Sequence, residues 1–198
     1  MPLLPALAFA RQLIEGRLKN GGRALDGTAG NGRDTLFLAQ LVGGNGKVWA
    51  FDIQAQALSN TAGLLRENGV EGQVELIAAS HADLADYVRE PLDAAMFNFG
   101  YLPGGDKTVT TKADGSVRAM QAAAALLAEG GLLAEGGLLT AVVYSGHPAG
   151  RAEAAAIEQW AAALPQEQYQ VLHYRFTNQR NHPPQLLAIE KRIRKPNR

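Results

Sequence analysis

A glycine-rich loop flanked by acids lies near the start of the chain. The segment 26–32 reads Asp-Gly-Thr-Ala-Gly-Asn-Gly, follows a short apolar run and precedes a helical pattern. Glycines let such a loop pass close to a ligand, and the N–H groups that begin the helix point toward it. A second apolar run ends in Asp52, twenty residues after Gly32, where Rossmann-type sites place a carboxylate against ribose. This order predicts a site for a nucleoside-containing cofactor.

The charge of the loop indicates which cofactor it binds. The dinucleotide pattern is Gly-x-Gly-x-x-Gly, whereas the glycines here are Gly27, Gly30 and Gly32. Carboxylates at Asp26 and Asp34 would repel a pyrophosphate, but they suit the sulfonium and amine of S-adenosylmethionine. The alternative is structural: Asp34 complements the helix dipole and Asp26 braces the turn. We predict S-adenosylmethionine as the cofactor.

Polar side chains also follow the third and fourth apolar runs. Ser80 and His81 stand where the adenine or ribose of the cofactor would arrive, although a capping or packing role is the alternative for His81. The amide oxygen of Asn98 can accept N–H bonds from a substrate amine and aim its lone pair at the methyl group. Tyr101 could stack on a base or pack at the strand end.

Methyl transfer to an amine is an in-line displacement that creates little charge. Alignment can supply ~7–11 kcal/mol, whereas general acid–base help of ~10²–10⁴-fold supplies about 3–5 kcal/mol. Positioning should therefore dominate, provided that the amine is neutral. Three side chains are candidates for taking its proton: Asp106, Tyr144 and His147. The alternative for His147 is a turn after the fifth strand.

Short apolar runs alternate with helical patterns along the chain. Strands are expected at 23–26, 47–53, 73–79, 93–99, 138–144, 169–176 and 186–191, and helices at 34–41, 56–68, 82–89, 116–128 and 151–164. This alternation predicts an α/β fold in which helices cover both faces of a doubly wound parallel sheet. Only residues 177–185 separate the last two strands, too few for a crossover helix, so we expect antiparallel pairing there.

Composition and charge set the class of protein. The chain has 198 residues, of which 46% are hydrophobic and none is cysteine. We expect one domain (1–198), no metal site, and neither thiolate chemistry nor disulfides. Residues 1–22 are expected to contain an N-terminal helix rather than a secretory signal. No apolar run reaches the ~20 residues of a membrane span, so we expect a cytoplasmic protein.

Two features near the C-terminus stand apart from this pattern. The formal net charge is zero, yet 191–198 carries five basic residues and no acid, which leaves 14 basic against 19 acidic residues, or −5, elsewhere. Such a tail could bind phosphates locally or simply be solvated. The hexamer Leu-Leu-Ala-Glu-Gly-Gly occurs at 126–131 and again at 132–137. One copy suffices to end a helix, so we expect the second to lengthen the loop or add a turn.

Several strings of residues together resemble the MnmM (YtqB-like) methyltransferases. They are DGTAGNGRDT (26–35), FDIQ (51–54), SH (80–81), FNFGYLPGGDK (97–107), VYSGHP (143–148) and NQRNHPP (178–184). The likeness runs from Leu25 to Glu190. The glycine loop is generic, whereas the string from Asn98 to Lys107 and the Gly-His-Pro string are specific to that family. The duplicated hexamer departs from the family pattern.

The resemblance implies a class I methyltransferase fold, with seven strands of which the last is antiparallel, and S-adenosylmethionine as methyl donor. It implies methylation of the aminomethyl nitrogen of 5-aminomethyl-2-thiouridine at the tRNA wobble position, so the partner would be the anticodon region of tRNA. The implied cofactor contacts, added to Asp26, Thr28, Gly30 and Gly32 of the loop, are Asn31, Asp34, Asp52, Gln54, Ser80 and His81.

Other functions compatible with the fold stay open, because a fold does not determine activity. The substrate could be rRNA or a small-molecule amine, or the chain could be a non-catalytic module that binds a cofactor or nucleic acid. A homodimer is also compatible with the sequence.

Overall fold

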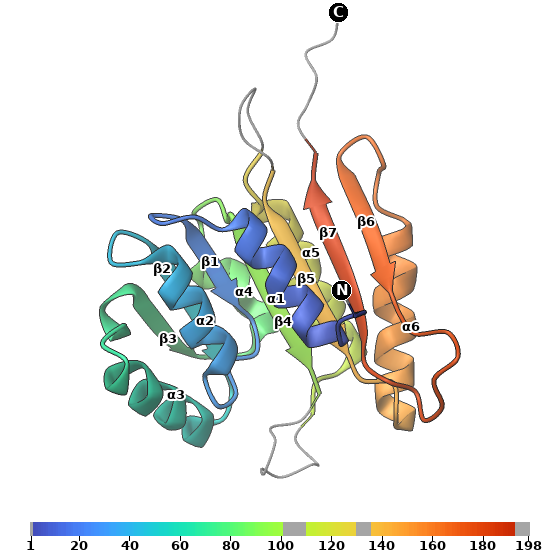
Figure 1. Cartoon of the computed structure of the whole chain (residues 1–198), viewed down its shortest axis with the longest axis horizontal. Coiled ribbons are helices and arrows are strands. Elements are labelled where there is room, and N and C mark those ends of the chain that lie inside the picture. The colour runs from blue at the N-terminus through green and yellow to red at the C-terminus, as the bar shows by residue number, and fades with distance from the viewer. Residues whose placement is uncertain (1, 101–109, 130–135, 193–198) are drawn as a thin grey trace, which may run out of the picture.

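Seven strands form one mixed sheet with helices on both faces (Figure 1). The computed structural model describes residues 2–100, 110–129 and 136–192. The strands are β1 (Arg23–Asp26), β2 (Lys47–Asp52), β3 (Val74–Ala78), β4 (Ala94–Phe99), β5 (Leu138–Val143), β6 (Tyr169–Tyr174) and β7 (Gln185–Lys191). Their order across the sheet is β3-β2-β1-β4-β5-β7-β6. This confirms the predicted class I methyltransferase arrangement.

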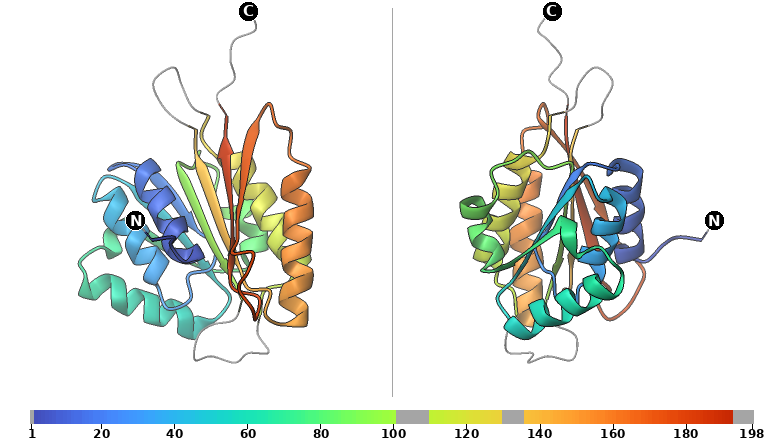
Figure 2. Two further views of the ribbon diagram at one scale, coloured as in Figure 1. Left: turned by 45° about the vertical axis from the view of Figure 1, so that its right-hand side comes forward. Right: turned by 90° about the vertical axis from the view of Figure 1, so that its left-hand side faces the viewer.

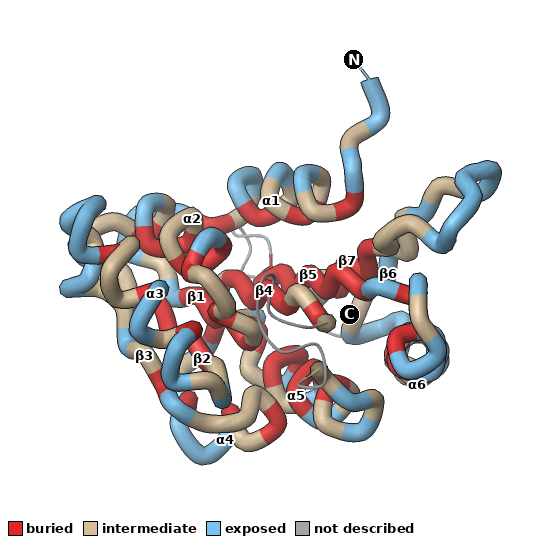
Figure 3. Tube along the Cα trace, turned by 90° about the horizontal axis from the view of Figure 1, so that it is seen from below, coloured by how far each residue is buried: buried red, intermediate tan, exposed pale blue. Residues whose placement is uncertain are grey.

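The helices separate into two layers (Figure 3). Their bounds are α1 (Ala6–Arg17), α2 (Arg33–Val42), α3 (Ala55–Glu67), α4 (Leu84–Tyr87), α5 (Ala113–Leu126) and α6 (Pro148–Ala162), with 3₁₀ turns η1 (Glu71–Gln73) and η2 (His81–Asp83). Ile14, Leu38 and Leu65 place α1, α2 and α3 in one apolar cluster. Met120 and Ile157 place α5 and α6 in the cluster on the opposite face. Two buried layers hold the central strands between them.

Strand direction determines where the loops meet. β1 to β5 are parallel, and β7 is antiparallel to both β5 and β6. We call the edge where β1 to β5 end the carboxyl edge, and the opposite one the amino edge. The β6–β7 connection lies at the carboxyl edge, whereas β7 ends at the amino edge (Figure 1).

The predicted elements are all present, with local differences. The helix expected at 82–89 is instead the 3₁₀ turn η2 followed by the single-turn helix α4. The helix expected at 151–164 begins earlier, at Pro148, because His147 caps it. Within the described residues 2–22, α1 is the only helix.

The duplicated hexamer begins where α5 ends. Leu126 is the last residue of α5, and Leu127 forms an isolated bridge with Leu92. The N–H of Gly137 donates to the carbonyl of Ala128 over 2.9 Å. The two ends of the repeat, near Ala128 and Gly137, therefore lie side by side. Residues 130–135 of the repeat lie outside the described residues. Within the described ranges, no helix has the length and apolarity needed to cross a membrane.

Candidate cofactor and acceptor site

Glycine is required at two positions of the loop between β1 and α2. A Cβ at Gly27 would lie 2.1 Å from the ring of Phe97, so the backbone passes directly over that ring. Gly32 adopts φ +80° just before α2, and its Cβ would meet Thr61 at 2.9 Å. Both features keep the loop compact at the carboxyl edge, just before the first turn of α2.

The side chain of Asp26 hydrogen-bonds residues of the glycine loop and of the first turn of α2. The residue is 1% exposed, its Oδ1 accepts from the N–H of Thr28 over 3.0 Å, and its Oδ2 accepts from the hydroxyl of Thr35 over 2.6 Å. Burial, followed by the charge of Asp34, raises the pKa of Asp26 to about 7. The structural role that sequence analysis left open is therefore present, and the group titrates near neutral pH.

Asp34 forms an ion pair with the N-terminal helix. In the first turn of α2, its Oδ1 accepts from both Nε and Nη2 of Arg11, at 2.8 and 2.7 Å. The guanidinium also lies 5.5 Å from the ring centre of Phe37. The sequence left two roles open for Asp34, a charge for the cofactor or a complement to the helix dipole; the tertiary structure also pairs it with a cation from α1.

Asp52 links the end of β2 to the glycine loop. Its Oδ2 accepts from the N–H of Gly30 over 2.9 Å, and its Oδ1 accepts from the N–H of Gln54 over 2.8 Å. The side chain is partly exposed, so its oxygens keep lone pairs for a ligand. On the neighbouring helix, Asn60 donates to the side-chain oxygen of Asn31 over 3.1 Å. The two acids, Asp26 and Asp52, thus flank one loop.

The segment after β3 has a capping residue and a packed imidazole. The hydroxyl of Ser80 accepts from the N–H of Ala82 over 3.2 Å and caps η2. The ring of His81 stands edge-on to Phe97 and Phe99, with centroids 6.4 and 5.7 Å away. Burial lowers the pKa of His81, which favours the neutral imidazole. Both residues lie at the carboxyl edge, as expected.

Asn98 presents a buried acceptor at the end of β4. Its backbone N–H donates to the hydroxyl of Thr28 over 2.7 Å, which joins β4 to the glycine loop. Its side-chain Oδ1 is buried and has no hydrogen-bond partner in the described structure. Because such an acceptor is costly unless satisfied, it is suited to an N–H donor from a ligand.

Two of the four remaining catalytic candidates lie within the described structure. Tyr144 follows β5, is 36% exposed, and its ring would be 3.7 Å from a Cβ at Gly100. His147 uses Nδ1 to accept from the N–H of Gly150 over 3.1 Å, so it caps α6 and only Nε2 is left for proton transfer. Two further candidates, Tyr101 and Asp106, lie outside the described residues.

One buried acid was missed by sequence analysis. Glu153 of α6 is 3% exposed and accepts from the hydroxyls of Ser116 (2.5 Å) and Thr111 (3.0 Å). The N–H of Thr111 in turn donates to the carbonyl of Gly100 over 3.1 Å. Helical spacing was the available indication, since Glu153 lies four residues before buried Ile157. Glu153 therefore holds the chain just beyond the segment that follows Asn98.

A metal centre is not indicated. Within the described ranges, no group of three or more acidic or histidine side chains could hold a metal ion. The polar groups gathered at the carboxyl edge are carboxylates, hydroxyls, an amide and backbone N–H groups, which suit an uncharged nucleoside with a cationic tail.

Comparisons with known proteins agree with this geometry. The family model described as "Putative rRNA methylase" matches residues 48–190. The Arabidopsis thaliana protein "tRNA (mnm(5)s(2)U34)-methyltransferase, chloroplastic" is 34% identical over 170 residues, which are 81% of this chain and 60% of that protein. The chain thus spans about 60% of the length of this curated relative.

Solved structures resemble the whole fold. A "putative rRNA-methylase" from Clostridium thermocellum has a TM-score of 0.92 and 36% identity, covering 96% of this chain and 100% of that one. A "putative methyltransferase" from Streptococcus mutans in complex with SAH has a TM-score of 0.85 and 34% identity, covering 96% and 99%. An rRNA methylase from Streptococcus thermophilus has a TM-score of 0.78 and 31% identity, covering 96% and 99%.

Proposed function

The chain belongs to the "Putative rRNA methylase" family, and from this premise we propose that it is an S-adenosylmethionine-dependent RNA methyltransferase. Its substrate would be the aminomethyl nitrogen of 5-aminomethyl-2-thiouridine at the tRNA wobble position. The observation that carries the proposal is the buried, unpartnered Oδ1 of Asn98, whose backbone is bonded to Thr28 of the glycine loop. An acceptor of amine N–H bonds therefore lies beside the proposed cofactor site.

The glycine loop and the two acids fit the cofactor. Gly27 and Gly32 let the loop pass close to Phe97 and Thr61, and partly exposed Asp52 is available to ribose hydroxyls. Buried Asp26 would contribute negative charge near the cationic tail, whereas Asp34 would act through its ion pair with Arg11. When bound, the cofactor supplies an electrophilic methyl group on sulfur. A relative solved with SAH supports this assignment.

The other predicted cofactor contacts are consistent with this placement. Asn31 lies within the glycine loop, Gln54 follows β2, and Ser80 and His81 follow β3, so all four belong to the carboxyl edge. The neutral imidazole of His81 would pack against or hydrogen-bond the adenosine without adding positive charge near the sulfonium.

Catalysis would depend mainly on alignment. Asn98 would accept the N–H bonds of the neutral amine and direct its lone pair toward the methyl group. Tyr101 would stack on the uracil ring. Tyr144, Asp106 and Nε2 of His147 are the groups proposed to receive the proton, and kinetics of single variants would choose among them.

The proposed partner is the anticodon region of tRNA. The Arabidopsis relative is named for methylation at U34 of tRNA, and the family description names rRNA. Asn98 could accept N–H bonds from an aminomethyl group or from the exocyclic amino group of a base, and the name of the Arabidopsis relative favours the tRNA nucleoside.

Labelled methyl donor and defined RNAs would test the proposal. The protein is incubated with tRNA that carries 5-aminomethyl-2-thiouridine, with the same tRNA lacking the aminomethyl group, and with rRNA. Nucleoside mass spectrometry should find one added methyl in the first sample alone. Methylation of rRNA, or of neither RNA, would overturn the tRNA assignment.

We also propose a homodimer through the face between α1 and the sheet edge. A groove of about 420 Å³ there includes Phe9, Leu13 and Leu172, and Leu172 and Val171 of edge strand β6 are 44% and 36% exposed. Exposed apolar side chains on an edge strand favour self-association. Sedimentation should give a dimer that Leu172→Glu converts to a monomer.

The cytoplasmic location stays a prediction.

A further inference from the structure

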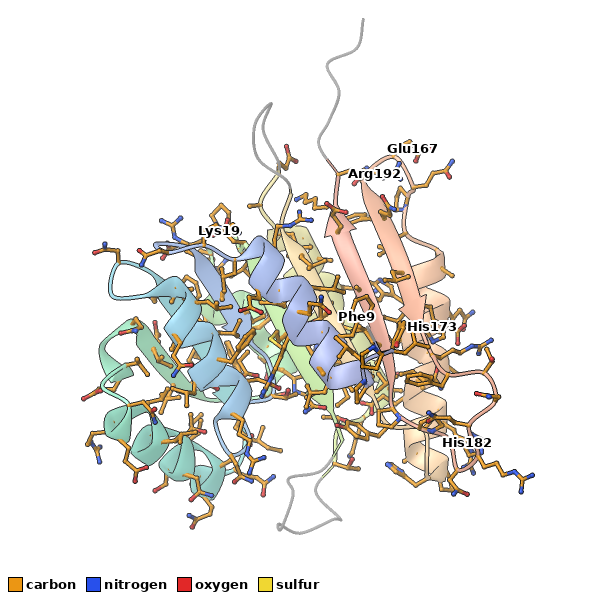
Figure 4. All side chains as sticks on the ribbon, in the orientation of Figure 1. Phe9, Lys19, Glu167, His173, His182 and Arg192 are labelled. Atoms are coloured by element: carbon orange, nitrogen blue, oxygen red, sulfur yellow. The ribbon has the colours of Figure 1, made fainter. Side chains whose placement is uncertain are left out.

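The connection between β6 and β7 surrounds a polar cavity at the carboxyl edge. The cavity has a volume of about 310 Å³, and its lining includes Arg175, Phe176, Gln179, His182 and Gln185. In Figure 4, His182 lies at the opposite end of the molecule from Lys19, Glu167 and Arg192. None of these lining residues belongs to the proposed cofactor site.

This cavity adjoins the segment that follows β5. Its Gln185 donates to the hydroxyl of Ser145 over 3.3 Å, directly after Tyr144. In the sheet, Gln185 pairs with Val143, and the preceding residue Val142 pairs with Asn98. β7 therefore lies two strands from β4, roughly 10 Å at about 4.8 Å per strand. That distance is longer than the roughly 3.4 Å between stacked nucleotides, so a neighbouring nucleotide would reach the cavity only when it is unstacked from the methylated one.

The loop offers positive charge that is not paired with an acid among the described residues. Residues 175–184 contain two arginines and one histidine but no acid. Arg175 and Arg180 are exposed, and neither forms an ion pair with any described residue. Unpaired guanidinium groups of this kind bind phosphates.

The start of the basic tail lies elsewhere. Lys191 donates to the carbonyls of Ala125 and Leu127, and Arg192 donates to Gln170, all at the amino edge (Figures 1 and 2). The tail residues 193–198 are outside the described part of the chain. Among described residues, the loop is therefore a better-placed source of positive charge for RNA at the site than the start of the tail.

The side chains around the cavity match the parts of one nucleotide. Phe176 and His182 provide planar rings for stacking, Gln179 provides an amide for a base edge, and Arg175 provides a phosphate contact. Asn181 and His182 adopt φ +68° and +48°. Two successive non-glycine residues in the left-handed region are uncommon, and such strain is typical of binding loops.

We infer that this cavity binds an unpaired nucleotide of the RNA, neighbouring the one that is methylated. The inference rests on the proposed function and adds a second nucleotide subsite to it. It explains how the protein would distinguish an anticodon loop from a free nucleoside: the loop supplies a neighbouring base and phosphates that the nucleoside lacks.

Kinetics with single variants would test the subsite. Arg180→Ala and Gln179→Ala remove exposed side chains, so folding should be unaffected, and thermal melting verifies it. The KM for tRNA should rise about tenfold, as expected for loss of one phosphate or base contact. The kcat at saturating tRNA and the Kd for S-adenosylhomocysteine should stay within twofold. Lys19→Ala, at the amino edge, is the matched control and should leave all three values unchanged.

Two further measurements distinguish the possible failures. The free nucleoside 5-aminomethyl-2-thiouridine should be methylated equally by wild type and loop variants, since it cannot reach the cavity. Arg175→Ala should also make the affinity for tRNA less dependent on salt. The slope of log affinity against log salt concentration should decrease by about 1, as expected for loss of one phosphate contact. If wild type methylates tRNA and the loop variants match it in KM, the subsite is wrong. If wild type methylates no tRNA, the proposed function itself fails.

Discussion

The N–H of Gly30 donates a 2.9 Å hydrogen bond to the carboxylate of Asp52, which fastens the glycine loop after β1 to the end of β2. One side chain thus shapes the loop and stays partly exposed for a ligand. If Asp52 binds the cofactor as proposed, loop geometry and cofactor binding are coupled there, and a substitution should affect both.

Asp52→Ala should abolish measurable cofactor binding. The change removes the proposed acceptor for ribose hydroxyls and releases the N–H groups of Gly30 and Gln54. Calorimetry with S-adenosylhomocysteine measures the loss. Asp52→Asn is the matched variant, because it keeps one acceptor and should retain weak binding. An unchanged affinity in Asp52→Ala would show that this carboxylate does not contact the ribose.

Asn98→Ala should lower turnover and leave cofactor affinity intact. The variant removes the buried, unpartnered Oδ1 but keeps the backbone N–H that bonds Thr28. A loss of alignment should reduce kcat by about 10²-fold or more, out of the ~7–11 kcal/mol that positioning can supply. Single-turnover methylation and calorimetry separate the two effects. Undiminished turnover would remove Asn98 from the mechanism.

Asp26 should make stability depend on pH. Its pKa is raised from 3.8 to about 7, so between these values the folded state binds a proton that the unfolded state releases. The free energy of unfolding should therefore fall as pH rises from about 4 to 7, by at most about 4 kcal/mol, and level off above. Urea unfolding at pH 5 and pH 8 measures the difference. Asp26→Asn should flatten this dependence; parallel profiles would contradict the assignment.

The same carboxyl group should couple cofactor binding to proton release. A cation near Asp26 favours the carboxylate and lowers its pKa from about 7. Binding of S-adenosylmethionine near pH 7 should therefore release part of one proton. Calorimetry in two buffers of different ionisation enthalpy detects it, and Asp26→Asn serves as the control. Equal enthalpies for wild type in both buffers would place the cationic tail away from Asp26.

Glu153 should position the chain that returns after Gly100. Its carboxylate accepts from Ser116 and Thr111 while buried, so Glu153→Ala leaves two hydroxyls unsatisfied and should cost about 3 kcal/mol of stability. Glu153→Gln should fold, because the amide keeps one acceptor. Its kcat should fall while the Kd for S-adenosylhomocysteine is retained. Thr111→Val should lower kcat to the same extent. The double variant with Glu153→Gln should have the same kcat as either single variant. Additive losses would show that the two residues act separately.

Much of the architecture was predictable because local patterns determine it. Alternating apolar runs and helical stretches predicted seven strands, and the short segment before β7 predicted antiparallel pairing; both are confirmed. Predicted strand ends differ by one or two residues. The helix after β3 was overestimated, since Ser80 caps a 3₁₀ turn there.

The candidate site was predictable only in part. Parallel strands bring their carboxyl ends together, so the placement of Asp52, Ser80 and Asn98 at one edge followed from their order. His147 was listed among the candidate bases, yet its Nδ1 caps α6. Nothing in the spacing distinguishes a capping histidine from a base.

The sequence by itself determined the class of fold, the glycine loop and the acids beside it, because these depend on residue type and on neighbours close in the chain. Tertiary structure alone decided that Arg11 pairs with Asp34, that Glu153 is buried among hydroxyls, and that the basic tail begins at the amino edge. Such pairings join segments that are far apart in sequence, and the packing of helices on the sheet brings them into contact.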